Sequence, residues 1–378
     1  MLARSRRDHL YRALRGTLHG AAIRGDQPLL THVLLESEPG SISLTTYNRS
    51  FWMRRLISAD VTQSGSLVTP AKLLTELIGA LDSADVELRL DQSVQQLVVT
   101  TEYDETQLQC GNRDMFPDFP LLSELQRTQL DLNQFLRALE QTIGAARQDA
   151  EDTPLSGVHF EMRAGLVLMV AGDGSRVAER KLIAASHEGP EMSFTVPVGS
   201  LKWFRDLADG EEGPATLGAV HDGRYVEIAV GAARLVSHAF EGRYPEHSGL
   251  IPTGALSRGR VARRDLISKL EAALLLAPAG HRVQLLLRGT DLLQITTEGT
   301  ELGRTRHELA SENEGDETDV TVDGESLARA AGVMDGDQVE ILTGPGQHVL
   351  LKPTSTNDLI YVICRMTQPP SVSFHTTQ

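Results

Sequence analysis

The order of hydrophobic and polar positions repeats three times along the chain. Each copy is a short run with strand-type alternation, then a turn-forming residue, then a helix whose apolar residues recur at spacings of three and four. The copies are residues 67–82, 194–210 and 320–336. Pro70, Pro197 and Asp323 occupy the same place in them, at spacings of 127 and 126 residues. The pattern predicts one structural unit that is present three times.

A second amphipathic helix recurs with a similar period. It is predicted at residues 8–21, 133–146 and 264–277. Leu14, Leu139 and Leu270 correspond in these helices, at spacings of 125 and 131 residues. In each copy the apolar residues form one face, which is typical of a helix that packs on a core.

Strand patterns lie between the predicted helices. Phe116-Pro117 and Tyr244-Pro245 each follow such a pattern and stand 128 residues apart. Proline cannot donate to a strand ladder, so it ends the strand. Chance similarity of unrelated segments is the alternative, but three markers with a common period near 127 argue against it. We therefore predict an α+β fold with three repeated domains and a C-terminal tail, at 1–126, 127–254, 255–367 and 368–378.

Charge is distributed unevenly along the chain. The formal net charge is −15, which alone argues against DNA binding because phosphate contacts come from Lys and Arg. Basic residues nevertheless crowd the first and third copies of this second helix and the residues beside them: Arg4, Arg6, Arg7, Arg12, Arg15 and Arg24, then Arg258, Arg260, Arg263, Arg264 and Lys269. This separation predicts a phosphate-attracting surface on an acidic protein, with ordinary solvated helix faces as the alternative.

Catalytic and metal-binding motifs are missing from the sequence. The 12 His include no HExxH pair, and there is no GxSxG, P-loop or GxGxxG motif. Cys110 and Cys364 are far apart and form no CxxC, so neither a zinc site nor a disulfide framework is indicated. We expect a non-catalytic protein with no metal and no cofactor; an enzyme is the alternative from another class. The lack of a signal peptide or of ~18 consecutive apolar residues predicts a cytoplasmic location.

Five segments together carry a resemblance to a known family. They are QPLLTHVLLESEPGSISLT, GSLVTPAKLLTELIGAL, GDGSRVAERKL, EGRYPEHSGLIP and LIYVICRM. In this order and spacing, the chain resembles the beta subunit of bacterial DNA polymerase III, the beta sliding clamp, from residue 1 to about residue 367.

The resemblance implies a fold and a mechanism. Three clamp domains per chain are expected, with two chains joined head to tail into a homodimeric ring that has inner helices and outer β-sheets. Such a ring encircles double-stranded DNA without reading its sequence and tethers the replicative polymerase as a processivity factor. The implied partners are the DNA polymerase III alpha subunit and the clamp loader, both through a cleft peptide motif, and no membrane. The alternative is a specialised paralogue that serves another polymerase or replaces a drug-sensitive clamp.

The resemblance also implies a cleft for partner peptides that carry Gln and large apolar residues. The matching positions are Leu155, Gly174, Arg176, Val177, Pro245, Leu250, Val362, Ile363, Cys364, Arg365 and Met366. Leu155, Val177 and Val362 would alternatively be plain core residues. The chain departs from the family at Ser175, where an aromatic residue or His is frequent, and in the residues that follow Met366.

Two further surfaces are implied in the same way. DNA contacts are expected at Arg24 and Gln148, with Lys72, Arg137 and Lys202 as additional candidates. For the dimer, Leu108 of an edge strand in the first domain is expected to meet Leu274 and Leu275 of a helix in the third domain of the other chain.

Overall fold

A computed structural model describes nine stretches of the chain: 1–22, 28–122, 126–148, 153–220, 223–251, 257–277, 280–297, 303–344 and 348–366. Arg24 and the predicted tail, 368–378, lie outside these stretches. The chain divides into two compact units, which are described separately. Unit 1 comprises Met1–Leu136, Phe160–Val167 and Ile183–Gly242. Unit 2 comprises Arg137–His159, Leu168–Leu182 and Arg243–Gln378.

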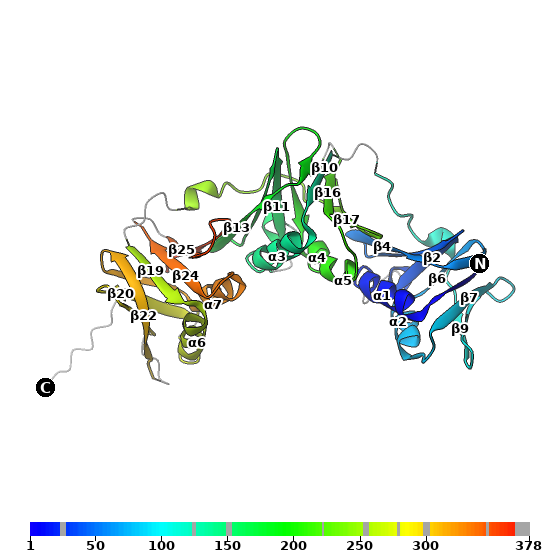
Figure 1. The fold of residues 1–378 in the computed structure, drawn as a ribbon, viewed down its shortest axis with the longest axis horizontal. Helices are drawn as coiled ribbons and strands as arrows, with labels where there is room; N and C mark the ends of the chain where they lie inside the picture. The colour runs from blue at the N-terminus through cyan, green and yellow to red at the C-terminus, as the bar shows by residue number, and fades with distance from the viewer. Residues whose placement is uncertain are drawn as a thin grey trace. The chain divides into compact units, whose positions relative to one another are not determined.

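Unit 1 contains a five-stranded sheet that carries two packed helices. Its strand order is β5 (Asp60–Gln63), β1 (Leu2–Arg6), β7 (Asp85–Asp91), β8 (Gln96–Thr100) and β9 (Glu105–Gln109). The helices α1 (Arg7–Leu18) and α2 (Ala71–Ala80) pack against each other, as Figure 1 shows in blue. Their apolar faces meet the sheet in an aliphatic core that includes Leu10, Leu14, Leu74 and Ile78.

A nine-stranded antiparallel sheet joins the first repeat to part of the second within unit 1. Its order is β14 (Ser186–His187), β10 (Gln126–Leu130), β16 (Ala215–Ala219), β17 (Tyr225–Val230), β18 (Ala233–His238), β4 (Phe51–Ser58), β3 (Ser41–Tyr47), β2 (His32–Glu38) and β6 (Gly65–Pro70). The pairing of β4 with β18, which sets Met53 opposite Leu235, is called the first junction below.

Unit 2 has a continuous run of paired strands. The order is β13 (Arg176–Ile183), β26 (Leu359–Cys364), β25 (His348–Pro353), β24 (Gln338–Thr343), β19 (Ser257–Ala262), β22 (Arg306–Gly315), β21 (Leu292–Thr296), β20 (Arg282–Arg288) and β23 (Thr318–Asp323). The helices α6 (Arg263–Leu274) and α7 (Gly324–Val333) pack together beside these strands (Figure 1). The pairing of β13 with β26 is called the second junction.

The remaining elements complete the chain. They are the strands β11 (Gly157–Arg163), β12 (Leu166–Gly172) and β15 (Met192–Pro197), the helices α3 (Leu132–Ile143), α4 (Val198–Leu201) and α5 (Phe204–Leu207), and the 3-10 turns η1 (Pro28–Thr31), η2 (Arg113–Met115), η3 (Pro154–Ser156) and η4 (Ser248–Leu250). Across the described stretches, no helix has the length and apolar character needed to cross a membrane.

The repeat markers have a structural explanation. Pro70, Pro197 and Asp323 end β6, β15 and β23 and are the N-cap residues of α2, α4 and α7. A proline is tolerated here because the first N–H groups of a helix have no intrahelical acceptor. Asp323 instead caps α7 with its carboxylate, which accepts hydrogen bonds from the N–H groups of Glu325 and Ser326.

The helices predicted at residues 8–21, 133–146 and 264–277 also follow the predicted pattern. Leu14 in α1, Leu139 in α3 and Leu270 in α6 are each at most 4% exposed. The helix predicted within residues 194–210 differs, because it is divided into α4 and α5 around Lys202 and Trp203. Trp203 leaves helical geometry (φ −100°, ψ 0°), and its ring stacks on His19 at a centroid distance of 3.6 Å. A tertiary aromatic contact therefore accompanies the interruption of a helix that the local pattern predicts as continuous.

Candidate peptide-binding cleft

The second junction positions most of the predicted cleft residues. Val177 pairs directly with Val362, and Arg176 pairs with Ile363. Paired residues lie on the same face of a sheet and successive residues on opposite faces, so the two valines share one face while Arg176 and Ile363 share the other. Val362 and Ile363 are 2% and 1% exposed. These two side chains are therefore part of the packed interior in this structure.

An apolar cluster forms beside this strand pair. Val170, Val177 and Tyr244 are buried in it, and the half-buried Leu155, Leu168 and Leu250 pack against them. Leu155 belongs to η3, Val177 to β13 and Leu250 to η4, so the fold brings together three predicted residues that are far apart in sequence. The leucines at its edge give the cluster an apolar, partly accessible surface suited to aliphatic or aromatic side chains.

Tyr244 anchors one wall of the cluster. Its ring stacks on His159 at 4.8 Å, and burial raises the pKa of its hydroxyl to about 12. Pro245 follows it and is exposed. Tyr244 appeared in the sequence as part of an aromatic-proline marker, but its central place in the cluster comes from the tertiary structure.

The turn between β12 and β13 forms the polar rim. One carboxylate oxygen of Asp173, Oδ1, accepts hydrogen bonds from the N–H groups of Ser175 (2.8 Å) and Arg176 (3.1 Å). Gly174 has φ +97°, a left-handed conformation in which a side chain would be strained. The N–H of Cys364 donates to the carbonyl of Ser175 at 2.8 Å, which ties the end of β26 to the turn.

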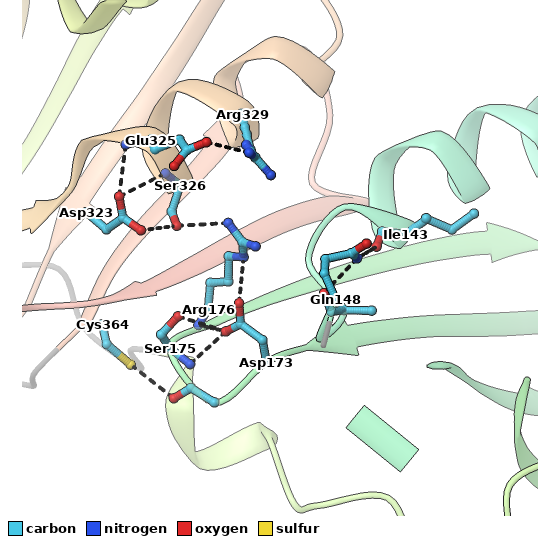
Figure 2. A network of polar contacts seen from close by, with 12 residues as sticks. Ile143, Gln148, Asp173, Ser175, Arg176, Asp323, Glu325, Ser326, Arg329 and Cys364 are labelled. Carbon is cyan, nitrogen blue, oxygen red and sulfur yellow. Dashed lines mark hydrogen bonds and ion pairs between the residues drawn. The ribbon is translucent and has the colours of Figure 1, made fainter. Parts of the chain in front are cut away.

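Arg176 is held in place from two sides. Its Nε lies 3.0 Å from Oδ2 of Asp173, and its Nη1 donates to the hydroxyl of Ser326 at 2.9 Å. Figure 2 shows these contacts between the turn and the beginning of α7. Ser326 and Asp173 were not among the sequence candidates, and Ser326 carries no sequence signal beyond its position in the first turn of a helix.

The last described residues run toward β23. The N–H of Met366 donates to the carbonyl of Thr321 at 2.8 Å, and Arg365 forms an isolated bridge with Val322. The guanidinium of Arg365 donates to the carbonyl of Gly344 at 3.1 Å. These contacts fix the backbone of two predicted cleft residues along the strand that leads into α7.

A buried carboxylate supports the same wall. Glu179 in β13 lies 3.5 Å from Nε2 of His247 and 3.2 Å from the Lys181 ammonium. The hydrogen bond from His247, followed by the contact with Lys181, holds the pKa of Glu179 below its usual value. His247 stands between Tyr244 and Leu250 in sequence, so this pair anchors the segment that carries both.

A hollow in unit 1 offers a contrast. It has a volume of about 790 Å³ and is lined in part by Glu36, Arg54, Glu227 and Arg234. Arg54 already lies 3.1 Å from Glu36, and Arg234 lies 3.2 Å from Glu227. Since these four residues neutralise one another in pairs and the lining carries charges of both signs, this hollow favours no one class of ligand.

Comparisons with known proteins place the chain in a family. Residues 1–122 match the DNA polymerase III beta subunit, N-terminal domain, and residues 129–246 match the central domain of the same subunit. A beta sliding clamp of Synechococcus elongatus is 24% identical over 346 residues, which are 90% of this chain and 92% of the relative. One of Staphylococcus epidermidis is 23% identical over 370 residues, 95% of this chain and 97% of the relative. The chain belongs to the DNA polymerase III beta subunit family.

Solved structures agree with this membership. A sliding clamp from Bacillus subtilis has a TM-score of 0.90 at 19% identity and covers 98% of this chain and 100% of its own. A sliding clamp from Pseudomonas aeruginosa bound to griselimycin has a TM-score of 0.91 at 20% identity, with 97% and 100% covered. The expected α+β fold of the clamp family is thus confirmed. The beta subunit family is non-catalytic, which sets the enzyme alternative aside.

The predicted DNA contacts of this clamp-family chain have different surroundings. Lys72 in α2 is 80% exposed and lies 3.7 Å from Glu76. Lys202 is exposed above the ring of Trp203, with its ammonium 4.5 Å from the ring centroid. Gln148 is exposed beyond the end of α3 and donates to the carbonyl of Ala146 at 2.9 Å.

Arg137 has a more constrained position. Its guanidinium contacts the carboxylate of Asp335 at 2.9 Å, that of Glu140 at 3.2 Å and the carbonyl of Val333 at 2.8 Å. These contacts bind α3 to the end of α7 and neutralise much of the charge that a phosphate would meet. Arg24, the first DNA candidate, lies outside the described residues.

The predicted dimer residues also differ from one another. Leu275, the C-cap of α6, is 82% exposed, and Leu274 is half-buried. Leu108 lies on β9, an edge strand of the five-stranded sheet, but is only 8% exposed and packs in the core of its own chain. Leu275 is therefore the predicted residue with the most surface left for a partner.

Proposed function

We propose that the chain is a DNA sliding clamp that encircles duplex DNA and tethers the replicative polymerase and other partners as a processivity factor. The family match across residues 1–122 and 129–246 carries the proposal. The repeat supports it, because Asp323 caps α7 where prolines precede the equivalent helices of the two matched segments. We place the domain boundaries near residues 126 and 254, and the protein in the cytoplasm.

Encirclement predicts retention by topology and weak direct affinity. With a net charge of −15, affinity for free linear duplex should be low and should fall as salt rises. On a nicked circle loaded by an ATP-using clamp loader, the protein should persist through gel filtration and should leave when the circle is cut. Equal retention on circular and linear DNA would contradict the proposal.

We also propose a head-to-tail dimer that uses Leu275. An exposed leucine at the end of a helix loses unfavourable contact with water when a partner covers it. Replacement of Leu275 by Asp should shift sedimentation equilibrium toward the 41.2 kDa monomer. The control is Leu73→Asp, because Leu73 in α2 is also exposed, at 49%. A wild-type protein that is monomeric at micromolar concentration would rule out the dimer.

The third part of the proposal concerns partner peptides. The cluster of Leu155, Val177 and Leu250, with the rim at Gly174 and Arg176, is the proposed cleft for a peptide with Gln and a Leu-Phe pair. The DNA polymerase III alpha subunit and the clamp loader are the proposed partners. Binding of such a synthetic peptide, measured by calorimetry, is the direct test, and Val177→Ser should weaken it by placing a hydroxyl in the apolar cluster.

A further inference from the structure

The first turn of α7 makes a hydrogen-bonded chain to the rim of the proposed cleft. Nη1 of Arg176 lies 2.9 Å from Oγ of Ser326, and that hydroxyl lies 2.7 Å from Oδ2 of Asp323. The other side of the guanidinium meets Asp173 at 3.0 Å. In Figure 2 the hydroxyl of Ser326 stands between the carboxylate of Asp323 and the guanidinium of Arg176.

The direction of these hydrogen bonds is determined by chemistry. An arginine can only donate, and an ionised aspartate can only accept. The hydroxyl of Ser326 must therefore accept from Arg176 and donate to Asp323. Ser326 is 3% exposed, so water does not readily replace either contact. This makes the hydroxyl the one group in the chain of contacts that both charged residues require.

The cap of α7 does not depend on this hydroxyl. Oδ1 of Asp323 accepts from the N–H of Glu325 at 3.0 Å and from that of Ser326 at 3.3 Å, and both are backbone groups. Glu325 further contacts Arg329 and lies 2.9 Å from His281. Removal of the hydroxyl would leave the helix capped while Arg176 loses an acceptor.

We propose that Ser326 is a positioning residue that orients Arg176 at the rim of the partner cleft and thereby sets the affinity for the peptide. The proposal rests on the proposed function of that cleft. Arg176 also follows the turn at Gly174 and Ser175, so its fixed guanidinium stiffens the rim before a partner arrives. Pre-ordering of this kind lowers the entropy lost on binding.

The charges also indicate which peptide group the rim accepts. Arg176 carries one positive charge, whereas Asp173 and Asp323 carry two negative charges close to it. A carboxylate would meet net negative charge, so the remaining N–H donors of Arg176 suit a neutral acceptor, such as an amide or backbone carbonyl oxygen. Ser326 thus favours a neutral acceptor by holding Arg176 between the two carboxylates.

Two shape-matched variants test the hydroxyl. Ser326→Thr keeps it and Ser326→Val removes it, while both add similar bulk at a buried position. Calorimetry with the synthetic Gln and Leu-Phe peptide should show about tenfold weaker binding for Ser326→Val than for Ser326→Thr, which corresponds to about 1.4 kcal/mol. Ser200→Ala is the control, because Ser200 is a buried serine in unit 1 whose hydroxyl contacts that of Ser237 at 2.7 Å; peptide affinity should not change.

A double-mutant cycle separates positioning from a general structural effect. Arg176→Ala should weaken binding, and adding Ser326→Val to it should cost no more, because the hydroxyl acts through Arg176. Equal affinities of the Thr and Val variants, or fully additive losses, would overturn the inference. A wild-type protein that fails to bind the peptide would instead refute the proposed cleft. Ser326→Ala, checked by thermal melting, repeats the comparison if the bulkier variants do not fold.

Discussion

The two strand junctions have the same backbone register but different side chains. At the first, Met53 of β4 pairs with Leu235 of β18; at the second, Ala178 of β13 pairs with Tyr361 of β26. The offsets between corresponding residues are 125 on one strand and 126 on the other, which is the period of the sequence repeat. The fold therefore builds the same antiparallel contact twice, once in each unit.

Side-chain size separates the two junctions. At the first, Trp52 stacks on Tyr47 at 4.1 Å and packs with Phe119. Aromatic rings of the chain itself therefore cover this face of the strand pair. At the second, the residue that corresponds to Trp52 is Val177, which packs with aliphatic leucines and Tyr244. A repeated strand pairing thus becomes a candidate binding surface where the side chains of the chain itself are small.

A pair of corresponding arginines gives the sharpest test of the comparison. Arg55 is 5% exposed and donates to the Leu207 carbonyl at 2.9 Å and to Glu211 at 3.0 Å. Arg180, its counterpart, meets Asp358 at 2.5 Å, but Asp358 is 39% exposed. Arg55→Ala should lower the free energy of unfolding by about 3–5 kcal/mol, because it removes a buried cation that pairs with the half-buried carboxylate of Glu211 and donates to the Leu207 carbonyl.

Arg180→Ala should cost less, about 1–2 kcal/mol, since water can reach Asp358. Urea denaturation of both variants measures the difference. Equal losses would show that burial of the acidic partner does not distinguish the two junctions.

A substitution at Val177 should make the second junction resemble the first. Val177→Trp introduces the residue type of the first junction and should fill the proposed cleft. The overpacked core should lose about 1–3 kcal/mol of stability, and peptide binding should drop below detection in calorimetry. Val177→Ile is the control, because it adds one methylene and should keep measurable binding. A Trp variant that binds like the wild type would place the peptide site elsewhere.

The smallest expected effect is a pH dependence at the second junction. Glu179 corresponds to Arg54 in the repeat, so no carboxylate occupies this position at the first junction. Because the hydrogen bond from His247 and the contact with Lys181 lower the pKa of Glu179, its stabilising contribution is present above pH ~4.5 and is lost as pH falls through the depressed value.

Glu179→Gln should therefore cost about 1 kcal/mol at pH 7. The difference from the wild type should shrink in melting experiments as the pH falls from ~4.5 through the depressed pKa, at which the carboxylate of the folded wild type takes up a proton. The exposed Glu241, changed to Gln, is the control. A difference that stays constant down to pH 3 would remove Glu179 as its cause.

Local sequence signals predicted the elements well and the site partly. Pro70, Pro197 and Asp323 were identifiable because helix starts depend on a few adjacent residues. For the cleft, it is the family resemblance and not a local pattern that predicts Leu155, Val177 and Leu250. The structure brings these three together in one cluster. Their role in binding stays a prediction.

Other features had no local signal. Arg176 and Ser326 are 150 residues apart, and only the packing of α7 near the β12–β13 turn brings them within 2.9 Å. The helix break at Trp203 likewise accompanies a ring contact with His19, which lies in another repeat. A short sequence window contains only one partner of such a contact, so periodicity cannot predict it.

The sequence by itself determined the threefold repeat, the α+β class and the helix starts, because hydrophobic period and cap chemistry act over a few residues. Tertiary structure alone decided that Leu108 is buried in its own core, that Arg137 is committed to Asp335, and that Ser326 reaches Arg176. Those outcomes depend on which distant surfaces pack together. Burial and pairing of a charged group are properties of that packing and are not encoded in any one segment.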